Sequence, residues 1–336
     1  MNRTQRIINN SIKKFDLNLD DLTVFTEAAT GNYSYTPIIA AISGAKMVYA
    51  LAKDSNYGTK ESICARINNI SEFFKVNHKI KVIFEKKPKY IFDSDIITNS
   101  GFVRPIDKTM IDAMKKTAVI PLMYEMFEFR PTDIDLDYCK IKNIRVLGTN
   151  ESSKELNLFY SVGFLVTKLL FECGLEVYKN KFLIIGSGII GNSIQTFFTR
   201  NCVESYRITF DNKECGKYVT YFNDFDITTL KIDEYDAIII CEHVYQNKII
   251  GKDGFINDTI INYISDIQII HICGNVDQNY LLHHKCNFYP KDIASFGYMT
   301  RHADYLGKIF TIELNTAGLK VGEIMARENI CGDKNE

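Results

Sequence analysis

A glycine-rich segment in the second half of the chain has the residue types and spacing that suit a bound phosphate group. Gly186, Gly188 and Gly191 form a G-x-G-x-x-G pattern directly after the apolar run Phe182–Ile185. In a strand-turn-helix unit, the first glycine permits a tight turn, the second lets the backbone approach a diphosphate, and the third lets helix and strand pack closely. Amides at the start of the helix then face the phosphates. The predicted diphosphate-binding residues are Gly186, Ser187, Gly188, Ile189, Ile190 and Gly191.

An acidic residue stands where the ribose of a nucleotide is expected. Asp211 directly follows the next apolar run, Tyr206–Phe210. In dinucleotide-binding units, the acid that binds the ribose lies about 20 residues beyond the glycines. Its carboxylate would accept hydrogen bonds from ribose hydroxyls and repel a 2′-phosphate. The sequence therefore predicts NAD as the cofactor and makes NADP less favoured, although Lys213 could meet a 2′-phosphate. The alternatives are a glycine turn that binds nothing and one that binds an S-adenosyl compound.

Three polar residues follow predicted strands in the first half of the chain, namely Glu27, Arg104 and Arg130. Ligands of α/β sheets bind beyond the carboxyl ends of the strands. We therefore expect Glu27 and one of the two arginines to contact a small-molecule substrate, with the arginine gripping a carboxylate or phosphate. Ordinary turn chemistry at Glu27 and an ion pair between Arg130 and a nearby carboxylate are the alternatives.

Histidines offer one further candidate for proton transfer. His302 precedes the last predicted helix and could serve as a general acid or base. His271 lies inside an apolar strand, which favours a core histidine. No HxH, HExxH or Cys/His spacing occurs, so no metal site is predicted.

The elements that must position these residues alternate between short apolar strands and helical segments in both halves of the chain. This order predicts parallel sheets with right-handed crossovers, hence an α/β fold. A polar connection, Gly148–Glu155, separates the halves, and Thr311–Arg327 is an amphipathic segment expected to return to the first domain. The predicted domains are residues 1–155 together with about 305–336, and residues 156–304.

Composition limits the partners. Of the 336 residues, 46% are hydrophobic and 24% charged, and the formal net charge is −1, which is typical of globular proteins. The basic residues are scattered, so no nucleic acid or anionic membrane partner is expected. Nine cysteines without framework spacing, an N-terminus without a leader pattern, and no apolar run of about 18 residues favour a cytoplasmic protein.

The arrangement resembles the formate/glycerate dehydrogenase superfamily, which includes the D-2-hydroxyacid dehydrogenases. Besides the glycine turn, the segments Asp133–Glu151 and Gly274–Asp277 are similar to that family. The resemblance implies a flavodoxin-like substrate domain, a Rossmann-type NAD-binding domain, a C-terminal helix on the first domain, and a homodimer. It also places Asn275 in the loop beneath the nicotinamide.

The chain departs from this family at the catalytic pair. Where the family carries an arginine after the fifth strand, this chain has Gly274-Asn275-Val276, and it has no Pro-His pair. Reduction of a 2-keto acid needs an arginine for the carboxylate and a histidine as acid/base, so those roles are not transferred. The prediction is an NAD-dependent oxidoreductase acting on a small anionic metabolite in an interdomain cleft. The alternatives are an NAD-retaining lyase or hydrolase with a layout like S-adenosylhomocysteine hydrolase, and a non-catalytic nucleotide-binding protein.

Overall fold

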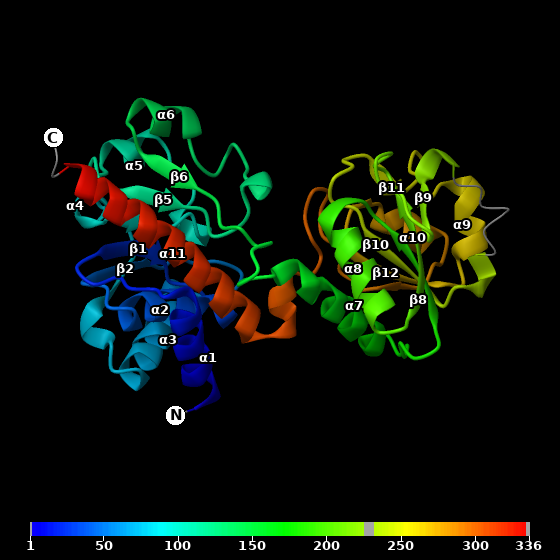
Figure 1. Ribbon diagram of the computed structural model, residues 1–336, viewed down its shortest axis with the longest axis horizontal. Coiled ribbons are helices and arrows are strands. Elements are labelled where there is room, and N and C mark those ends of the chain that lie inside the picture. Colours follow the sequence, from blue (N-terminus) through cyan, green and yellow to red (C-terminus); the bar gives the residue numbers. More distant parts are fainter. Residues whose placement is uncertain (1, 225–231, 334–336) are drawn as a thin grey trace. The chain divides into compact units, whose positions relative to one another are not determined.

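The computed structural model describes residues 2–224 and 232–333 and divides the chain into two compact units. Unit 1 comprises Met1–Asn157 and Gly307–Glu336, and unit 2 comprises Leu158–Leu306 (Figure 1). Each unit contains a six-stranded parallel sheet with helices. The predicted fold class, two α/β domains with the last helix in the first, is thereby confirmed.

The sheet of unit 1 has the strand order β3-β2-β1-β4-β5-β6. This six-stranded order is that of the Rossmann fold, and within it the strands β2-β1-β4-β5-β6 follow the flavodoxin-like order predicted for this unit. The order reverses between β1 and β4, so their carboxyl ends form the topological switch point at which such sheets bind ligands. The strands are β1 (Thr23–Glu27), β2 (Met47–Leu51), β3 (Ile80–Ile83), β4 (Ile96–Ile97), β5 (Val119–Pro121) and β6 (Arg145–Leu147).

Two apolar layers cover this sheet because alternate strand residues point to opposite faces. Val24 belongs to one buried cluster and its neighbour Phe25 to another, and both side chains are fully buried. The helices of unit 1 are α1 (Arg3–Phe15), α2 (Thr36–Ile42), α3 (Lys60–Phe73), α4 (Pro88–Asp93), α5 (Lys108–Asp112), α6 (Leu136–Ile141) and α11 (Lys308–Asp333).

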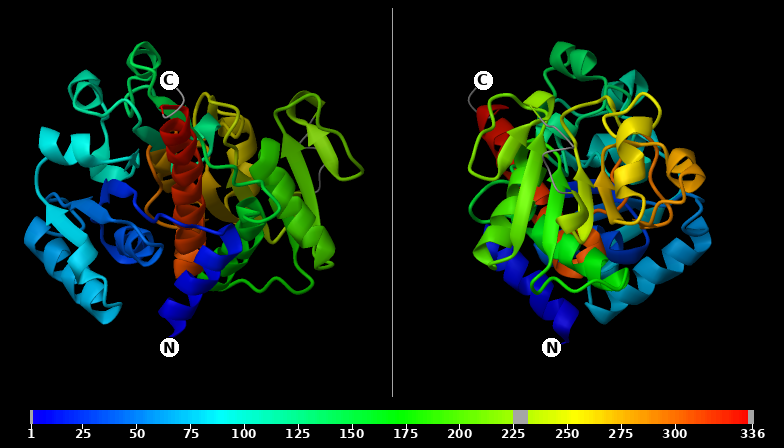
Figure 2. Two further views of the ribbon diagram at one scale, coloured as in Figure 1. Left: turned by 60° about the vertical axis from the view of Figure 1, so that its left-hand side comes forward. Right: turned by 90° about the vertical axis from the view of Figure 1, so that its right-hand side faces the viewer.

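Helix α11 returns to unit 1 and packs beside α1, as Figure 2 shows for the red and blue helices. The buried hydroxyl of Ser11 donates to that of Thr316 over 2.9 Å. Further along, Gly322 lies so close to the sheet that an added Cβ would be 2.8 Å from Ile96 Cγ2 and 3.0 Å from Pro121 Cγ. The C-terminal helix is therefore an integral layer of unit 1.

Unit 2 has a sheet with the order β14-β12-β10-β7-β8-β9 and a separate two-stranded sheet, β11-β13. The order reverses between β7 and β10, which places a second switch point there. The strands are β7 (Lys181–Ile185), β8 (Glu204–Thr209), β9 (Val219–Tyr221), β10 (Ala237–Cys241), β11 (Lys248–Ile250), β12 (Gln268–Cys273), β13 (Asn275–Val276) and β14 (Phe288–Tyr289), and the helices are α7 (Ser161–Glu172), α8 (Gly188–Arg200), α9 (Asp258–Ile264) and α10 (Gln278–His283).

The central strand β10 is buried along its whole length, as expected for a parallel strand covered by helices on both faces. Helices α7 and α8 lie in contact on one face, where an added Cβ on Gly163 would be 2.4 Å from Phe197 Cβ. Within the described ranges, no helix combines the length and apolar character needed to cross a bilayer.

The close approach of α11 to the sheet can be tested by replacing Gly322 with alanine. We expect Gly322→Ala to lower the free energy of unfolding by about 1–3 kcal/mol, because the added methyl group must push helix and sheet apart. Urea unfolding measures the change. Ile324→Ala, at a half-exposed position of the same helix, is the control and should cost less; equal stability of wild type and Gly322→Ala would contradict the packing.

Candidate functional site

The glycine-rich turn of unit 2 has the geometry of a strand-turn-helix unit. Gly188 begins α8 with φ +65°, a left-handed conformation that favours glycine. An added Cβ on Gly191 would lie 2.4 Å from the carbonyl oxygen of Gly186. The first and last glycines thus let α8 pack directly on the end of β7.

The end of β10 and the loop after it lie too close to the turn for side chains at two of the glycine positions. An added Cβ on Gly186 would lie 2.6 Å from Cys241 Sγ, and one on Gly188 would lie 2.8 Å from both His243 Cε1 and Val244 Cγ2. These side chains fill the space beside the turn. Each glycine of the pattern therefore has a structural reason that involves no ligand.

Two carboxylates accept hydrogen bonds from the backbone of the turn. The Ser187 amide donates to Glu242 Oε2 over 2.7 Å, and the Gly188 amide donates to Glu214 Oε1 over 2.9 Å. The start of a helix carries unpaired amides and a partial positive charge, which favour an anion there. In this protein two internal glutamates supply that anion, and sequence analysis identified neither.

Glu242 is a fixed part of the fold. It is 1% exposed, and it also accepts from the Ser187 hydroxyl at 2.7 Å, the Val244 amide at 2.7 Å and the Tyr245 amide at 2.6 Å. The amide and hydroxyl of Ser187, a predicted cofactor-binding residue, are thus engaged within the protein.

Glu214 lies in the loop after β8 and has two further donors. Its Oε2 accepts from Arg207 Nη1 and from the Thr209 hydroxyl, both over 2.6 Å. Arg207 is buried and also donates to the Gly186 carbonyl over 3.1 Å. The resulting ion pair connects β8 with the glycine turn.

Parts of the turn still match the donors that a dinucleotide needs. Ile189 and Ile190 lie in the first turn of α8, whose amides have no acceptor within the helix. Asp211 is half-buried just beyond β8, and one of its carboxylate oxygens accepts from the Lys213 amide over 2.9 Å. The frame therefore fits a dinucleotide, but Glu214 holds the amide of Gly188, where a diphosphate would have to approach.

The remaining predicted residues of unit 2 have different surroundings. Asn275 donates to the Gln246 carbonyl and accepts from the Gly297 amide at 2.9 Å, so it connects loops of the fold. His302 is exposed in the segment before α11. His271 is a core histidine, as expected: its ring bonds to Thr300, and burial lowers its pKa to about 4.

In unit 1, Glu27 ends β1 at the switch point, and burial raises the pKa of its carboxyl. Its Oε1 accepts from the Phe102 amide over 3.3 Å, and nearby Arg104 moderates the pKa shift. An added Cβ on Gly101 would lie 1.9 Å from the Glu27 carboxylate. The loop after β4 is thus built around Glu27.

Arg104 pairs with Asp133, and Arg130 is exposed. The Arg104 Nη1 to Asp133 Oδ2 distance is 3.0 Å, and the Tyr124 hydroxyl donates to the same oxygen over 2.9 Å. The ion pair considered for Arg130 stays a prediction, whereas Arg104 forms one with Asp133. The structure brings Glu27 and Arg104 to one edge of the sheet.

Asn99 follows β4 at this edge and is fully buried. Its Oδ1 accepts from the Met123 amide over 2.9 Å, whereas its Nδ2 contacts no hydrogen-bond acceptor in the described part of the chain. A buried donor without an acceptor costs free energy. Asn99 is therefore an additional candidate for contact with a ligand.

Glu151 is a second residue that sequence analysis missed. It is 6% exposed, and its amide donates to Glu125 Oε1 over 2.6 Å. Burial, together with the neighbouring carboxylates of Glu128 and Glu125, raises its pKa to about 8. The sequence indicates only a polar connection here, although the position of this segment directly after β6 was a signal for a residue at the sheet edge.

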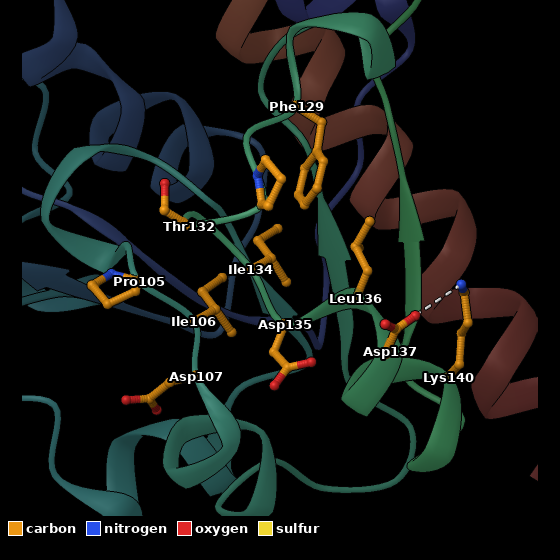
Figure 3. Close-up of a pocket in the computed structure, with 11 residues that line it drawn as sticks. Pro105, Ile106, Asp107, Phe129, Thr132, Ile134, Asp135, Leu136, Asp137 and Lys140 are labelled. Carbon is orange, nitrogen blue, oxygen red and sulfur yellow. Dashed lines mark hydrogen bonds and ion pairs between the residues drawn. The ribbon is translucent and has the colours of Figure 1, made fainter.

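A cavity of about 410 Å³ lies on the loops that follow β4 and β5. Ile106 and Ile134, which pair through a parallel β-bridge, lie in its centre in Figure 3, and Phe129 flanks them. Asp107 and Asp135 face the same space, but each also accepts a backbone hydrogen bond that begins a helix. In the described residues, no group of three or more His, Cys, Asp or Glu side chains is placed to hold a metal ion.

No family model and no curated protein matches this chain. Among solved structures, it is similar to a dipicolinate synthase chain from Bacillus halodurans, with 10% identity and a TM-score of 0.56, covering 93% of this chain and 99% of that chain. The corresponding Bacillus subtilis chain matches with 10% identity and a TM-score of 0.55, covering 96% and 100%. An NADPH-dependent glyoxylate/hydroxypyruvate reductase from Sinorhizobium meliloti matches with 10% identity and a TM-score of 0.48, covering 91% and 92%. The likeness to the first two shows a shared two-domain fold.

The raised pKa of Glu151 predicts a pH-dependent stability. Because the folded protein keeps this proton up to about pH 8 and the unfolded chain only to about 4.5, the stabilisation is complete below about pH 4.5. It is lost as pH rises through about 8, with a slope of at most about 1.4 kcal/mol per pH unit. Glu151→Gln cannot ionise and should flatten this slope in urea unfolding.

Glu155→Gln, at an exposed glutamate of the same segment, is the matched control and should keep the wild-type slope. If Glu151→Gln and wild type lose stability equally between about pH 5 and about pH 8, Glu151 does not retain its proton in the folded state.

Proposed function

We propose that this protein is an NAD-dependent oxidoreductase in which unit 2 binds the dinucleotide and unit 1 binds a small-molecule substrate. The observation that carries the proposal is the first turn of α8, which begins within the G-x-G-x-x-G pattern at the switch point between β7 and β10. Asp211 stands beyond the neighbouring strand. This is the layout in which amides hold a diphosphate and a carboxylate holds a ribose.

On the cofactor side, the amides of Ile189 and Ile190 would hold the diphosphate, and the carboxylate of Asp211 would accept from the ribose hydroxyls. A bound nicotinamide supplies a hydride acceptor or donor. A carboxylate at Asp211 disfavours the 2′-phosphate of NADP, so NAD is the proposed cofactor. Lys213 is exposed beside it and is the residue through which NADP would gain affinity.

On the substrate side, the carboxyl edge of unit 1 combines hydrogen-bond donors, cations and a protonated acid. Arg104 or Arg130 would hold an anionic group of the substrate, and Asn99 Nδ2 offers a buried donor. Glu27 and Glu151 are carboxyls with raised pKa values. Because Glu151 stays protonated near neutral pH, it can donate a proton, a role that sequence analysis gave to His302.

A second candidate is a nucleoside ligand without a diphosphate, such as an S-adenosyl compound. The two carboxylates on the turn, Glu214 and Glu242, favour it because they repel phosphate. Asp211 would hold the ribose in either case. The two candidates therefore differ in whether phosphate strengthens or weakens binding.

Binding of NADH tests the proposed function directly. We expect NADH at 100 times its Kd to stabilise the protein by about 2.7 kcal/mol, and Asp211→Ala to weaken NADH binding by about tenfold through loss of the ribose contacts. Calorimetry and thermal unfolding with NADH, NADPH and S-adenosylhomocysteine measure both effects.

Lys213→Ala is the matched control in the same loop, since it should leave NADH affinity unchanged and weaken only NADPH. Binding of S-adenosylhomocysteine without NADH binding would favour the nucleoside candidate. If neither ligand shifts the unfolding temperature, the proposed function is wrong.

A further inference from the structure

Glu214 receives the same kinds of donor that a phosphate group would receive at this turn. One oxygen accepts from the Gly188 amide at the start of α8, and the other accepts from Arg207 and Thr209. A helix-start amide, a guanidinium and a hydroxyl are the groups that proteins use to bind phosphate. The carboxylate therefore occupies an anion site that the fold has already built.

A diphosphate and this carboxylate cannot share the site. Both are anions, and the only cation described at this site is the guanidinium of Arg207. The Arg207 side chain is 3% exposed. Charges are poorly screened away from bulk water, so two anions against one cation would repel each other strongly. A diphosphate that reaches the Gly188 amide must displace Glu214.

The two glutamates on the turn differ in their freedom to move. Glu242 is 1% exposed and accepts four hydrogen bonds from Ser187, Val244 and Tyr245. Glu214 has a partly exposed side chain in a surface loop whose neighbours, Lys213 and Cys215, are exposed. Only Glu214 can leave without breaking the core of unit 2.

Asp211 shapes the loop that presents Glu214. The Lys213 amide donates to the Asp211 carboxylate over 2.9 Å, and the Glu214 amide donates to the Asp211 carbonyl over 3.1 Å. A ribose that donates hydrogen bonds to the Asp211 carboxylate would compete with the Lys213 amide. Ribose binding would thus loosen the turn that holds Glu214 against α8.

We propose that Glu214 is an internal ligand of the glycine turn, that a dinucleotide displaces it on binding, and that this exchange sets the affinity for diphosphate ligands. The inference rests on the proposed function, because it concerns the same site. After displacement, the diphosphate would take over the Gly188 amide and Arg207, so neither the helix start nor the guanidinium is left without an anion.

The test compares wild type with Glu214→Gln, Glu214→Ala and the control Glu204→Gln. Glutamine keeps the size and one of the two acceptor oxygens but removes the charge, so we expect this variant to disturb the loop less than alanine, which leaves Arg207 without its ion pair. Glu204 is the first residue of β8, the strand that leads into the loop of Glu214, and its side chain is exposed. The Kd values of NADH, ADP-ribose and adenosine are measured by calorimetry.

We expect Glu214→Gln to lower the Kd of NADH and ADP-ribose by about tenfold and to leave that of adenosine unchanged, with Glu204→Gln equal to wild type. Without ligand, Glu214→Ala should unfold at a lower temperature than wild type. ADP-ribose should raise the unfolding temperature of Glu214→Ala by more than it raises that of wild type. If Glu214→Gln binds NADH no more tightly than wild type does, the inference is overturned. The proposed function still stands in that case, provided that wild type binds NADH. Tighter binding of all three ligands, adenosine included, would overturn it as well. Absence of binding in every variant would overturn both.

Discussion

The amides at the start of α8 need acceptors, and the way this protein supplies them determines what unit 2 can bind. Close packing of Gly191 on Gly186 fixes the position of the helix start. Glu242 connects the turn to the end of β10, and Glu214 connects it to the loop after β8. Two acidic side chains thus join the three central strands of the sheet, β10, β7 and β8, at their carboxyl ends. Any nucleotide must bind at a helix start whose positive charge is already partly neutralised.

Unit 1 has contacts of the same kind at the carboxyl edge of its own sheet. The Phe102 amide donates to Glu27, and the Glu151 amide donates to Glu125, so glutamates again serve backbone amides at the edge of a parallel sheet. The carboxyls of Glu27 and Glu151 are removed from water, so their pKa values rise rather than fall. The edge of unit 1 therefore holds a proton on Glu151 near neutral pH, while the turn of unit 2 holds the ion pair between Arg207 and Glu214. Under the proposed function, unit 1 would carry the proton transfer and unit 2 would bind the diphosphate.

The sequence predicted the sheets better than it predicted the sites. The apolar runs Met47–Leu51 and Ala237–Cys241 match β2 and β10 residue for residue, because buried parallel strands carry continuous apolar sequence. The glycine pattern located α8, which begins at Gly188. Helix α1 was not predicted from the sequence, although Ile8 and Ser11 are buried one helical turn apart.

The contacts of the site escaped prediction for a physical reason. Which acid pairs with Arg104 depends on how two loops meet, and they meet through the bridge between Ile106 and Ile134, which no spacing in the sequence reveals. The same holds for Glu214, which is 26 residues from Gly188 and reaches it only through the fold of its loop.

The glycine pattern alone therefore cannot distinguish a nucleotide site from a tight turn. Gly186, Gly188 and Gly191 would each be required here by Cys241, by His243 with Val244, and by the Gly186 carbonyl, even without a ligand. The distinguishing property is which groups accept hydrogen bonds from the amides. An acceptor buried in the core, such as Glu242, commits its amide to the fold. An acceptor on a surface loop, such as Glu214, leaves its amide to the stronger of two competing anions, and Arg207 stabilises whichever anion remains. The capacity of this turn to bind a diphosphate thus depends on one exchangeable carboxylate more than on its three glycines.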